Sequence, residues 1–109
     1  MELYYLITIT DRENAEDVSN VYAQADVSLV LTKLGRGTAT GEHLSNYGLD
    51  ATEKAVISTV STAEQMRQIF KASKRRLRID IPGNGVMMAV PLKSVAGGRT
   101  LQYLAETAE

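Results

Sequence analysis

Cysteine is absent from the chain, so disulfides, thiolate catalysis and Cys-based metal sites are excluded together. The absence suits a reducing compartment, and we expect a cytoplasmic protein. Histidine occurs once, at His43, with no Asp, Cys or second His at the spacing of metal ligands. We interpret His43 as a loop residue, and no metal-binding residue can be assigned.

An excess of charge is also lacking, because the formal net charge is −1 over 109 residues. Nucleic-acid and membrane-surface binding therefore have no global electrostatic basis. The apolar amino terminus, residues 1–10, is too short to span a bilayer and carries no basic leader, so we expect no direct membrane insertion. With no repeat or linker and an ordinary apolar content of 44%, the chain is expected to form one domain, residues 1–109.

A catalytic constellation is missing as well. No nucleophile is paired with a base, and the acidic residues are spread over predicted helix faces instead of forming a carboxylate pair. We therefore expect a non-enzymatic protein.

Short apolar segments and amphipathic segments alternate along the chain. Thr10 and Asp11 are good helix N-cap types before a helix predicted over Arg12–Gln24. Thr62 and Gln65 form a capping box for a second helix that reaches Leu77. β-branched and aliphatic residues predict four strands, over Leu3–Ile9, Val27–Leu34, Lys54–Val60 and Val86–Val90.

The resulting order, βαββαβ, predicts an α+β fold of the ferredoxin-like kind, with an antiparallel sheet and two helices on one face. The first two predicted strands carry apolar residues at both odd and even positions, so both of their faces are apolar. In a strand with one solvated face, apolar and polar residues alternate more regularly. We therefore expect the second face to be buried against another copy of the chain.

Two glycine-bearing segments are candidates for anion binding. In LGRGTA, residues 34–39, the glycines allow positive φ and close backbone approach, Arg36 offers a forked cation and Thr38 a hydroxyl. The alternative is a strand-end turn with Arg36 solvated. The candidate residues here are Gly35, Arg36, Gly37 and Thr38.

The second segment is IPGNGV, residues 81–86, which suits a tight turn with outward N–H groups. An ordinary turn is the alternative. The candidate residues are Pro82, Gly83, Asn84 and Gly85. The basic run just before it, KRRLR at 74–78, is interpreted as a solvated helix end that matches the helix dipole.

A long connection between the second and third strands, residues 40–52, contains His43 and Tyr47. A compact domain seldom keeps such a loop unless it binds something or moves.

Three segments in order, LGRGTA at 34–39, YGLDATEKAV at 47–56 and PGNGVMMAVPLKSVAGG at 82–98, resemble the PII-like family, the nitrogen regulatory P-II superfamily. The resemblance covers nearly the whole chain. It implies a homotrimer whose sheets line a central channel, with an adenine nucleotide (ATP, ADP or AMP) bound between subunits. It also implies a flexible T-loop that contacts a target protein such as a transporter or a metabolic enzyme.

In terms of this resemblance, the T-loop corresponds to about 36–53, with His43 and Tyr47, and the phosphate-holding B-loop to about 79–85. Arg99 stands where the family often places a phosphate-binding arginine. Val86 departs from the family, which has a lysine directly after the B-loop glycines. A phosphate would then need Arg36, Arg99 or a basic residue of the second helix. The alternative is a metal- or small-metabolite-binding trimer that resembles the divalent-cation tolerance proteins.

Overall fold

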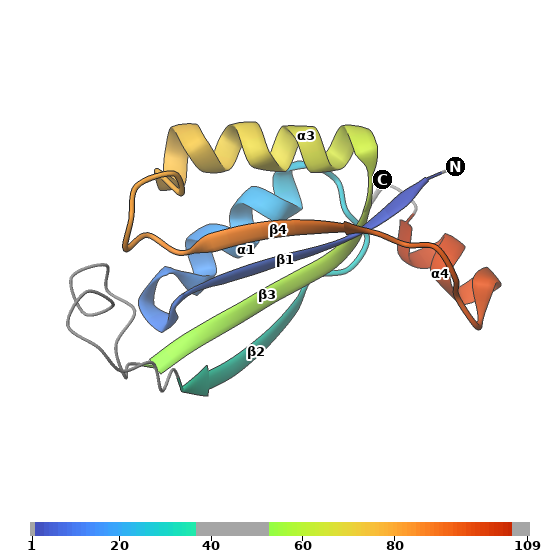
Figure 1. The fold of residues 1–109 in the computed structure, drawn as a ribbon, viewed down its shortest axis with the longest axis horizontal. Coiled ribbons are helices and arrows are strands. Elements are labelled where there is room, and N and C mark those ends of the chain that lie inside the picture. Colours follow the sequence, from blue (N-terminus) through green and yellow to red (C-terminus); the bar gives the residue numbers. More distant parts are fainter. Residues whose placement is uncertain (1, 37–52, 106–109) are drawn as a thin grey trace.

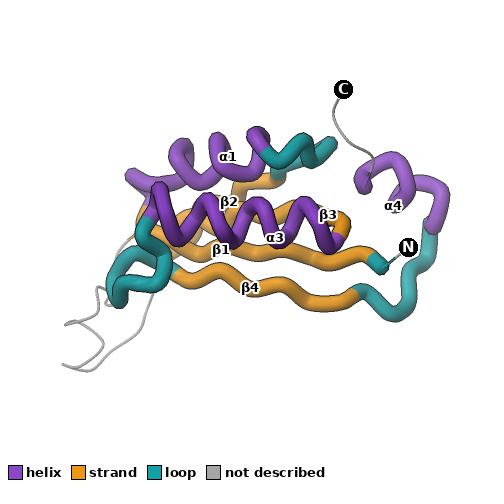
Figure 2. The backbone as a smooth tube through the Cα atoms, turned by 90° about the horizontal axis from the view of Figure 1, so that it is seen from above, coloured by secondary structure: helices purple, strands orange, loops and turns teal. Residues whose placement is uncertain are grey.

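The computed structural model describes residues 2–36 and 53–105. Its four strands form one antiparallel sheet in the order β2-β3-β1-β4. Two helices, α1 and α3, cover the same face of this sheet (Figure 1 and Figure 2). The elements are β1 Leu3–Asp11, α1 Ala15–Gln24, β2 Leu31–Arg36, β3 Glu53–Thr62, α3 Ala63–Ala72, β4 Val86–Pro91 and α4 Gly98–Ala105. The predicted ferredoxin-like βαββαβ class is confirmed.

The first strand runs two residues further than predicted, because Thr10 and Asp11 pair with β3 opposite Ala55 and Lys54. The N-cap role expected of Thr10 and Asp11 is therefore wrong. Asp11 precedes a 3-10 turn, Arg12–Asn14, without capping it through its side chain, and α1 starts only after that turn.

The second strand differs at both ends from the predicted Val27–Leu34. Val27 is buried in the core instead, and side chains hold the connection before β2. Gln65 Nε2 donates to the Asp26 carbonyl at 3.2 Å, and the Thr59 hydroxyl donates to the Leu29 carbonyl at 2.5 Å. These bonds occupy backbone groups that a longer strand would have paired with its neighbour.

The hydrophobic core lies between the sheet and the two helices. It includes a polar group, because the hydroxyl of the fully buried Tyr22 donates to the Ile57 carbonyl at 3.1 Å. The Thr8 hydroxyl, 2.6 Å away, then donates to Tyr22. Burial raises the pKa of Tyr22 to about 12. The buried apolar residues are Leu6, Val18, Val21, Tyr22, Ala25, Val27, Ala55, Ile57 and Ile69.

Helix α3 begins as predicted. Thr62 Oγ1 accepts the Gln65 N–H and Gln65 Oε1 accepts the Thr62 N–H, which completes the capping box. The helix continues into a π-helical turn, Ser73–Leu77, and ends at Arg78 in the left-handed region with φ 54°. The chain therefore turns sharply toward β4.

The face of the sheet opposite the helices carries rows of apolar side chains. Tyr5 lies between Val60 and Val90, and Ile7 lies opposite Met88 in the strand register. The larger exposed members of this open face are Tyr5, Leu31, Val86, Met88 and Val90. No helix or strand in the described part of the chain covers them.

The last helix, α4, is not predicted by the sequence pattern. It lies at the end of the sheet where β4 finishes, near the amino terminus (Figure 1). Across residues 2–36 and 53–105, no helix has the length and apolar character needed to cross a membrane.

Candidate functional site

Both glycine-bearing segments reach the same end of the sheet. Here β1 and β2 finish and β3 and β4 begin, so Asp11, Arg36, Glu53 and Gly85 lie along one end (Figure 1). The two segments adjoin opposite edge strands, β2 and β4, with β3 and β1 between them. At the usual strand spacing this separates them by roughly 14 Å. A ligand that contacts both within one chain must span two central strands.

The loop before β4 is built around glycines. Gly83 and Gly85 have φ of 97° and 111°, conformations that other residues rarely adopt. A Cβ on Gly85 would lie 2.6 Å from the Ile9 carbonyl oxygen, which is closer than atoms can approach. Only glycine therefore lets the loop pack against the end of β1.

Asn84 ties the same loop to the end of the helical region. Its side-chain amide donates to the Arg78 carbonyl at 2.9 Å and to the Leu77 carbonyl at 3.5 Å. Its own carbonyl accepts a long bond, 3.4 Å, from the Thr10 hydroxyl. The predicted turn is thus held from both the helix and β1.

Two backbone donors remain available in this turn. The Asn84 N–H donates to the Ile81 carbonyl at 3.1 Å, whereas the N–H groups of Gly83 and Gly85 have no acceptor within residues 2–36 and 53–105. N–H groups that flank a turn in this way suit a small anion.

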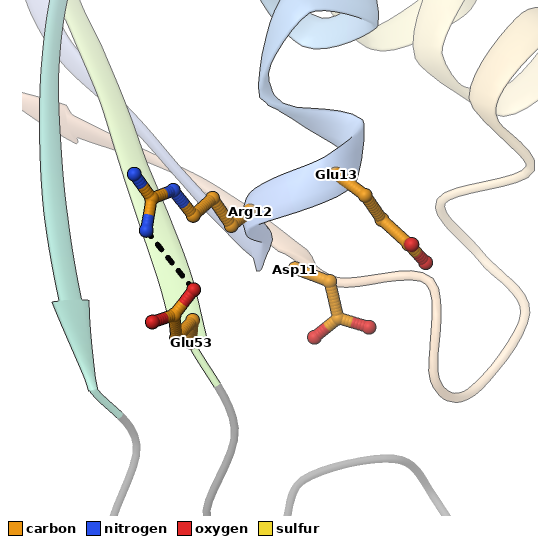
Figure 3. Close-up of a pocket in the computed structure, with 4 residues that line it drawn as sticks. All are labelled: Asp11, Arg12, Glu13 and Glu53. Atoms are coloured by element: carbon orange, nitrogen blue, oxygen red, sulfur yellow. Dashed lines mark hydrogen bonds and ion pairs between the residues drawn. The ribbon is translucent and has the colours of Figure 1, made fainter.

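Charged side chains occupy the centre of this end of the sheet. Arg12 Nη1 lies 3.0 Å from Glu53 Oε2, and Lys54 Nζ lies 2.5 Å from Asp11 Oδ1. A shallow depression is lined by Asp11, Arg12, Glu13 and Glu53, and Arg12 turns toward Glu53 and away from the other two carboxylates (Figure 3). The sequence pattern missed these pairs, because strand register brings them together and only local spacing is visible in sequence.

A second, polar pocket of about 230 Å³ lies on the helix-covered side of the same end, with Thr10, Asp17, Arg76 and Asn84 among its lining residues. Arg76 Nη1 donates to Gln24 Oε1, so part of the basic run is engaged by α1. The neighbouring residues Lys74, Arg75 and Arg78 are exposed, as expected for a solvated helix end.

The predicted site residues fall into three places. Gly35 and Arg36 are the exposed last residues of β2; Gly35 does not have positive φ, so the expected conformational role is wrong there. Arg99 lies in α4 at the opposite end of the sheet from the 79–85 loop, so one chain does not bring them together (Figure 1). Four candidates, Gly37, Thr38, His43 and Tyr47, lie outside the described residues.

No protein-family model matches the sequence, and no curated protein sequence matches it. Solved structures do match. A Bacillus subtilis GlnK–ATP complex aligns over 91% of this chain and 89% of its own, with 17% identity and a TM-score of 0.67. A Thiomonas intermedia CPII, a nitrogen regulatory PII-like protein bound to ADP, AMP and bicarbonate, aligns over 88% and 96%, with 12% identity and a TM-score of 0.67.

A third structure shows how widely the fold is used. A Bacillus cereus protein related to NIF3 aligns over 85% of this chain but only 26% of its own, with 18% identity and a TM-score of 0.62. The two nitrogen regulatory proteins, by contrast, match along nearly their whole length. The resemblance carried by the glycine-bearing segments is therefore confirmed in three dimensions, and the chain has the fold of the PII-type nitrogen regulatory proteins.

Proposed function

We propose that this chain is a non-enzymatic cytoplasmic regulator. Three copies associate through the open faces of their sheets, an adenine nucleotide binds between subunits, and the segment 36–53 contacts a target protein. The observation that carries the proposal is the 79–85 loop. It is anchored by Gly85 and Asn84, and it lies at the same end of the sheet as the root of that segment.

The oligomer is supported by the apolar open face. Val86, Met88 and Val90 are 47%, 39% and 49% exposed and follow one another along the edge strand β4. Contiguous exposed apolar surface of this kind is typical of protein–protein contacts. Analytical ultracentrifugation should give a trimer for the wild type and smaller species for Met88→Lys. Gln68→Lys, on the exposed surface of α3, is the matched control and should remain trimeric; a monomeric wild type contradicts the proposal.

Both the chemistry of the 79–85 loop and the fold support the binding of an adenine nucleotide. The positive-φ residues Gly83 and Gly85 present N–H groups that have no acceptor in the described part of the chain. The aligned GlnK structure holds ATP, and the aligned CPII structure holds ADP and AMP. The phosphate would bind at the 79–85 loop, with Pro82, Gly83, Asn84 and Gly85. Gly35, Arg36, Gly37 and Thr38 would contact the same ligand from the β2 side, and Arg99 would come from a neighbouring subunit.

Titration calorimetry with AMP, ADP and ATP tests the binding step. We expect saturable binding of at least one nucleotide, and an Arg99→Ala variant should bind it more weakly without losing the trimer. If a confirmed trimer gives neither heat nor thermal shift with any of the three, the nucleotide part of the proposal is wrong.

The regulatory step requires the ligand to alter the segment 36–53, because a ligand shifts an equilibrium only through its differential affinity for the two states. Hydrogen exchange in peptides that cover His43 and Tyr47 is the measurement. We expect saturating nucleotide to change the hydrogen-exchange rates of these peptides. Exchange that is identical with and without saturating nucleotide contradicts a reporting role for this segment.

A further inference from the structure

We infer that the polar pocket between α1 and the π-helical turn is a second ligand site, which binds a small zwitterion of the amino-acid class. The pocket has a volume of about 230 Å³. Clefts that take drug-sized ligands usually measure roughly 300–1,000 Å³, so this pocket suits a small metabolite and not a nucleotide. The inference therefore goes beyond the proposed function and does not depend on it.

One carboxylate and one guanidinium line this pocket, and they come from different elements. Asp17 lies in the first turn of α1, and Arg76 lies in the π-helical turn, Ser73–Leu77. The two side chains form no ion pair with each other, and within residues 2–36 and 53–105 Asp17 has no hydrogen-bond or ion-pair partner. A ligand that carries both an ammonium and a carboxylate group can pair with both side chains at once.

Arg76 can bind a carboxylate without losing its present contact. Its Nη1 donates to Oε1 of Gln24, a neutral acceptor, so this contact leaves the positive charge uncompensated. A guanidinium group has several further N–H donors, in a fork that matches the two oxygens of a carboxylate. The neighbouring side chains Lys74 and Arg75 are exposed and add positive potential around the same turn.

Asp17 distinguishes a zwitterion from a simple anion. A phosphate or a dicarboxylate bound at Arg76 would bring negative charge close to this carboxylate, whereas an ammonium group would be attracted to it. Val18 and Leu77 also line the pocket and supply apolar surface for the carbon atoms of the ligand. The lining therefore matches a short carbon skeleton with one charge of each sign.

The pocket is connected to the 79–85 loop through Asn84. This residue lines the pocket, and its side-chain amide donates to the carbonyls of Leu77 and Arg78. Its backbone carbonyl accepts the long bond from Thr10, which is another lining residue. A ligand in the pocket lies beside the residue that anchors the loop, so we expect it to reduce local opening of the loop.

A thermal-shift screen of the standard amino acids, each by itself, tests the inference on the wild-type protein without nucleotide. Titration calorimetry with the best of them should show saturable binding. The N-acetylated and the carboxamide derivatives of that amino acid lack one charge each, and each should bind about tenfold more weakly or worse. If no amino acid binds at millimolar concentration, or if succinate or inorganic phosphate binds equally well, the inference is overturned and the proposed function is unaffected.

Two variants test whether the ligand binds in this pocket. Asp17→Asn and Arg76→Gln should each weaken binding about tenfold or more, and Asp17→Asn should remove the discrimination against the N-acetylated derivative. Glu16→Gln and Arg75→Gln are the matched controls, because each removes the same charge from an exposed neighbour that does not line the pocket. Controls that weaken binding as much as the pocket variants would show that surface charge binds the ligand, and the inference is then wrong.

Hydrogen exchange locates the site without any substitution. Saturating amino acid should slow exchange in a peptide that covers residues 74–85 and leave a peptide from β2, Leu31–Arg36, unchanged. Binding that leaves exchange in residues 74–85 unchanged places the ligand elsewhere and overturns the inference.

Discussion

Gly85 and Gly35 lie at the same end of one sheet, yet their surroundings are opposite. Gly85 has φ of 111° and its missing Cβ would collide with a backbone oxygen of β1. Gly35 has no atom within 4 Å of the corresponding position and belongs to an edge strand. One glycine therefore holds a loop against the fold, while the other leaves a strand end open. The comparison teaches that glycines in similar motifs can have opposite structural roles, one required by close packing and one not.

The largest effect is expected from Gly85→Ala. The added Cβ must move the Ile9 carbonyl or the Thr10 side chain, and the backbone is strained in addition. We expect a loss of about 3 kcal/mol or more in the free energy of unfolding, measured by denaturant titration. A loss below about 1 kcal/mol would show that the loop is not rigidly seated on β1.

A substitution of Tyr22 tests the hydrogen bonds that its buried hydroxyl makes to Thr8 of β1 and Ile57 of β3. Tyr22→Phe loses the bonds to Thr8 and Ile57, and we expect it to cost about 1–2 kcal/mol at neutral pH. Burial raises the pKa of Tyr22 from 10.0 to about 12, so the unfolded state loses its proton first. The stabilisation is complete below pH 10 and is lost as pH rises toward 12, by roughly 2–3 kcal/mol.

The measurement is unfolding free energy against pH for both proteins. The difference between wild type and Tyr22→Phe in the free energy of unfolding should shrink above pH 10 and reverse in sign toward pH 12. Tyr5→Phe, which removes a phenol hydroxyl from the open face, is the matched control. A difference in unfolding free energy that stays constant up to pH 12 would contradict the burial of the Tyr22 hydroxyl.

Asn84→Ala should have a smaller effect, of about 1–2 kcal/mol, because the carbonyls of Arg78 and Leu77 lose their amide donor. Asn84→Asp, which keeps the shape but not the donor, should lose as much. Asn20→Ala, on the exposed side of α1, should lose nothing. If Asn84→Asp is as stable as wild type, the amide bonds do not anchor the loop.

The smallest effect belongs to Gly35→Ala. The space is open and φ is not positive, so we expect a change within about 0.5 kcal/mol in thermal or chemical unfolding. A loss comparable to that of Gly85→Ala would remove the distinction between the two glycines.

The comparison also marks where sequence reasoning succeeded. Pro82, Gly83, Asn84 and Gly85 were predicted as a tight turn because that chemistry is local, and the structure contains it. The positive φ predicted for Gly35 is wrong, because the sequence does not distinguish an extended glycine in a strand from a glycine in a turn. The predicted second strand starts too early for a related reason. Residues 27–30 are as apolar as a strand, yet Gln65 and Thr59 donate to the carbonyls of Asp26 and Leu29 and hold this stretch as a connection.

Sequence by itself determined the class of fold, the capping box of α3 and the turn before β4, since each depends on residues within a few positions of one another. Tertiary structure alone decided the ion pairs Arg12–Glu53 and Lys54–Asp11, because residues 41 or 43 positions apart meet only through strand register. It also decided that the two glycine-bearing segments lie at one end of the sheet and that Arg99 lies at the other. The pairing of strands that are distant in the sequence sets these distances, so the spacing of residues within a short segment does not predict them.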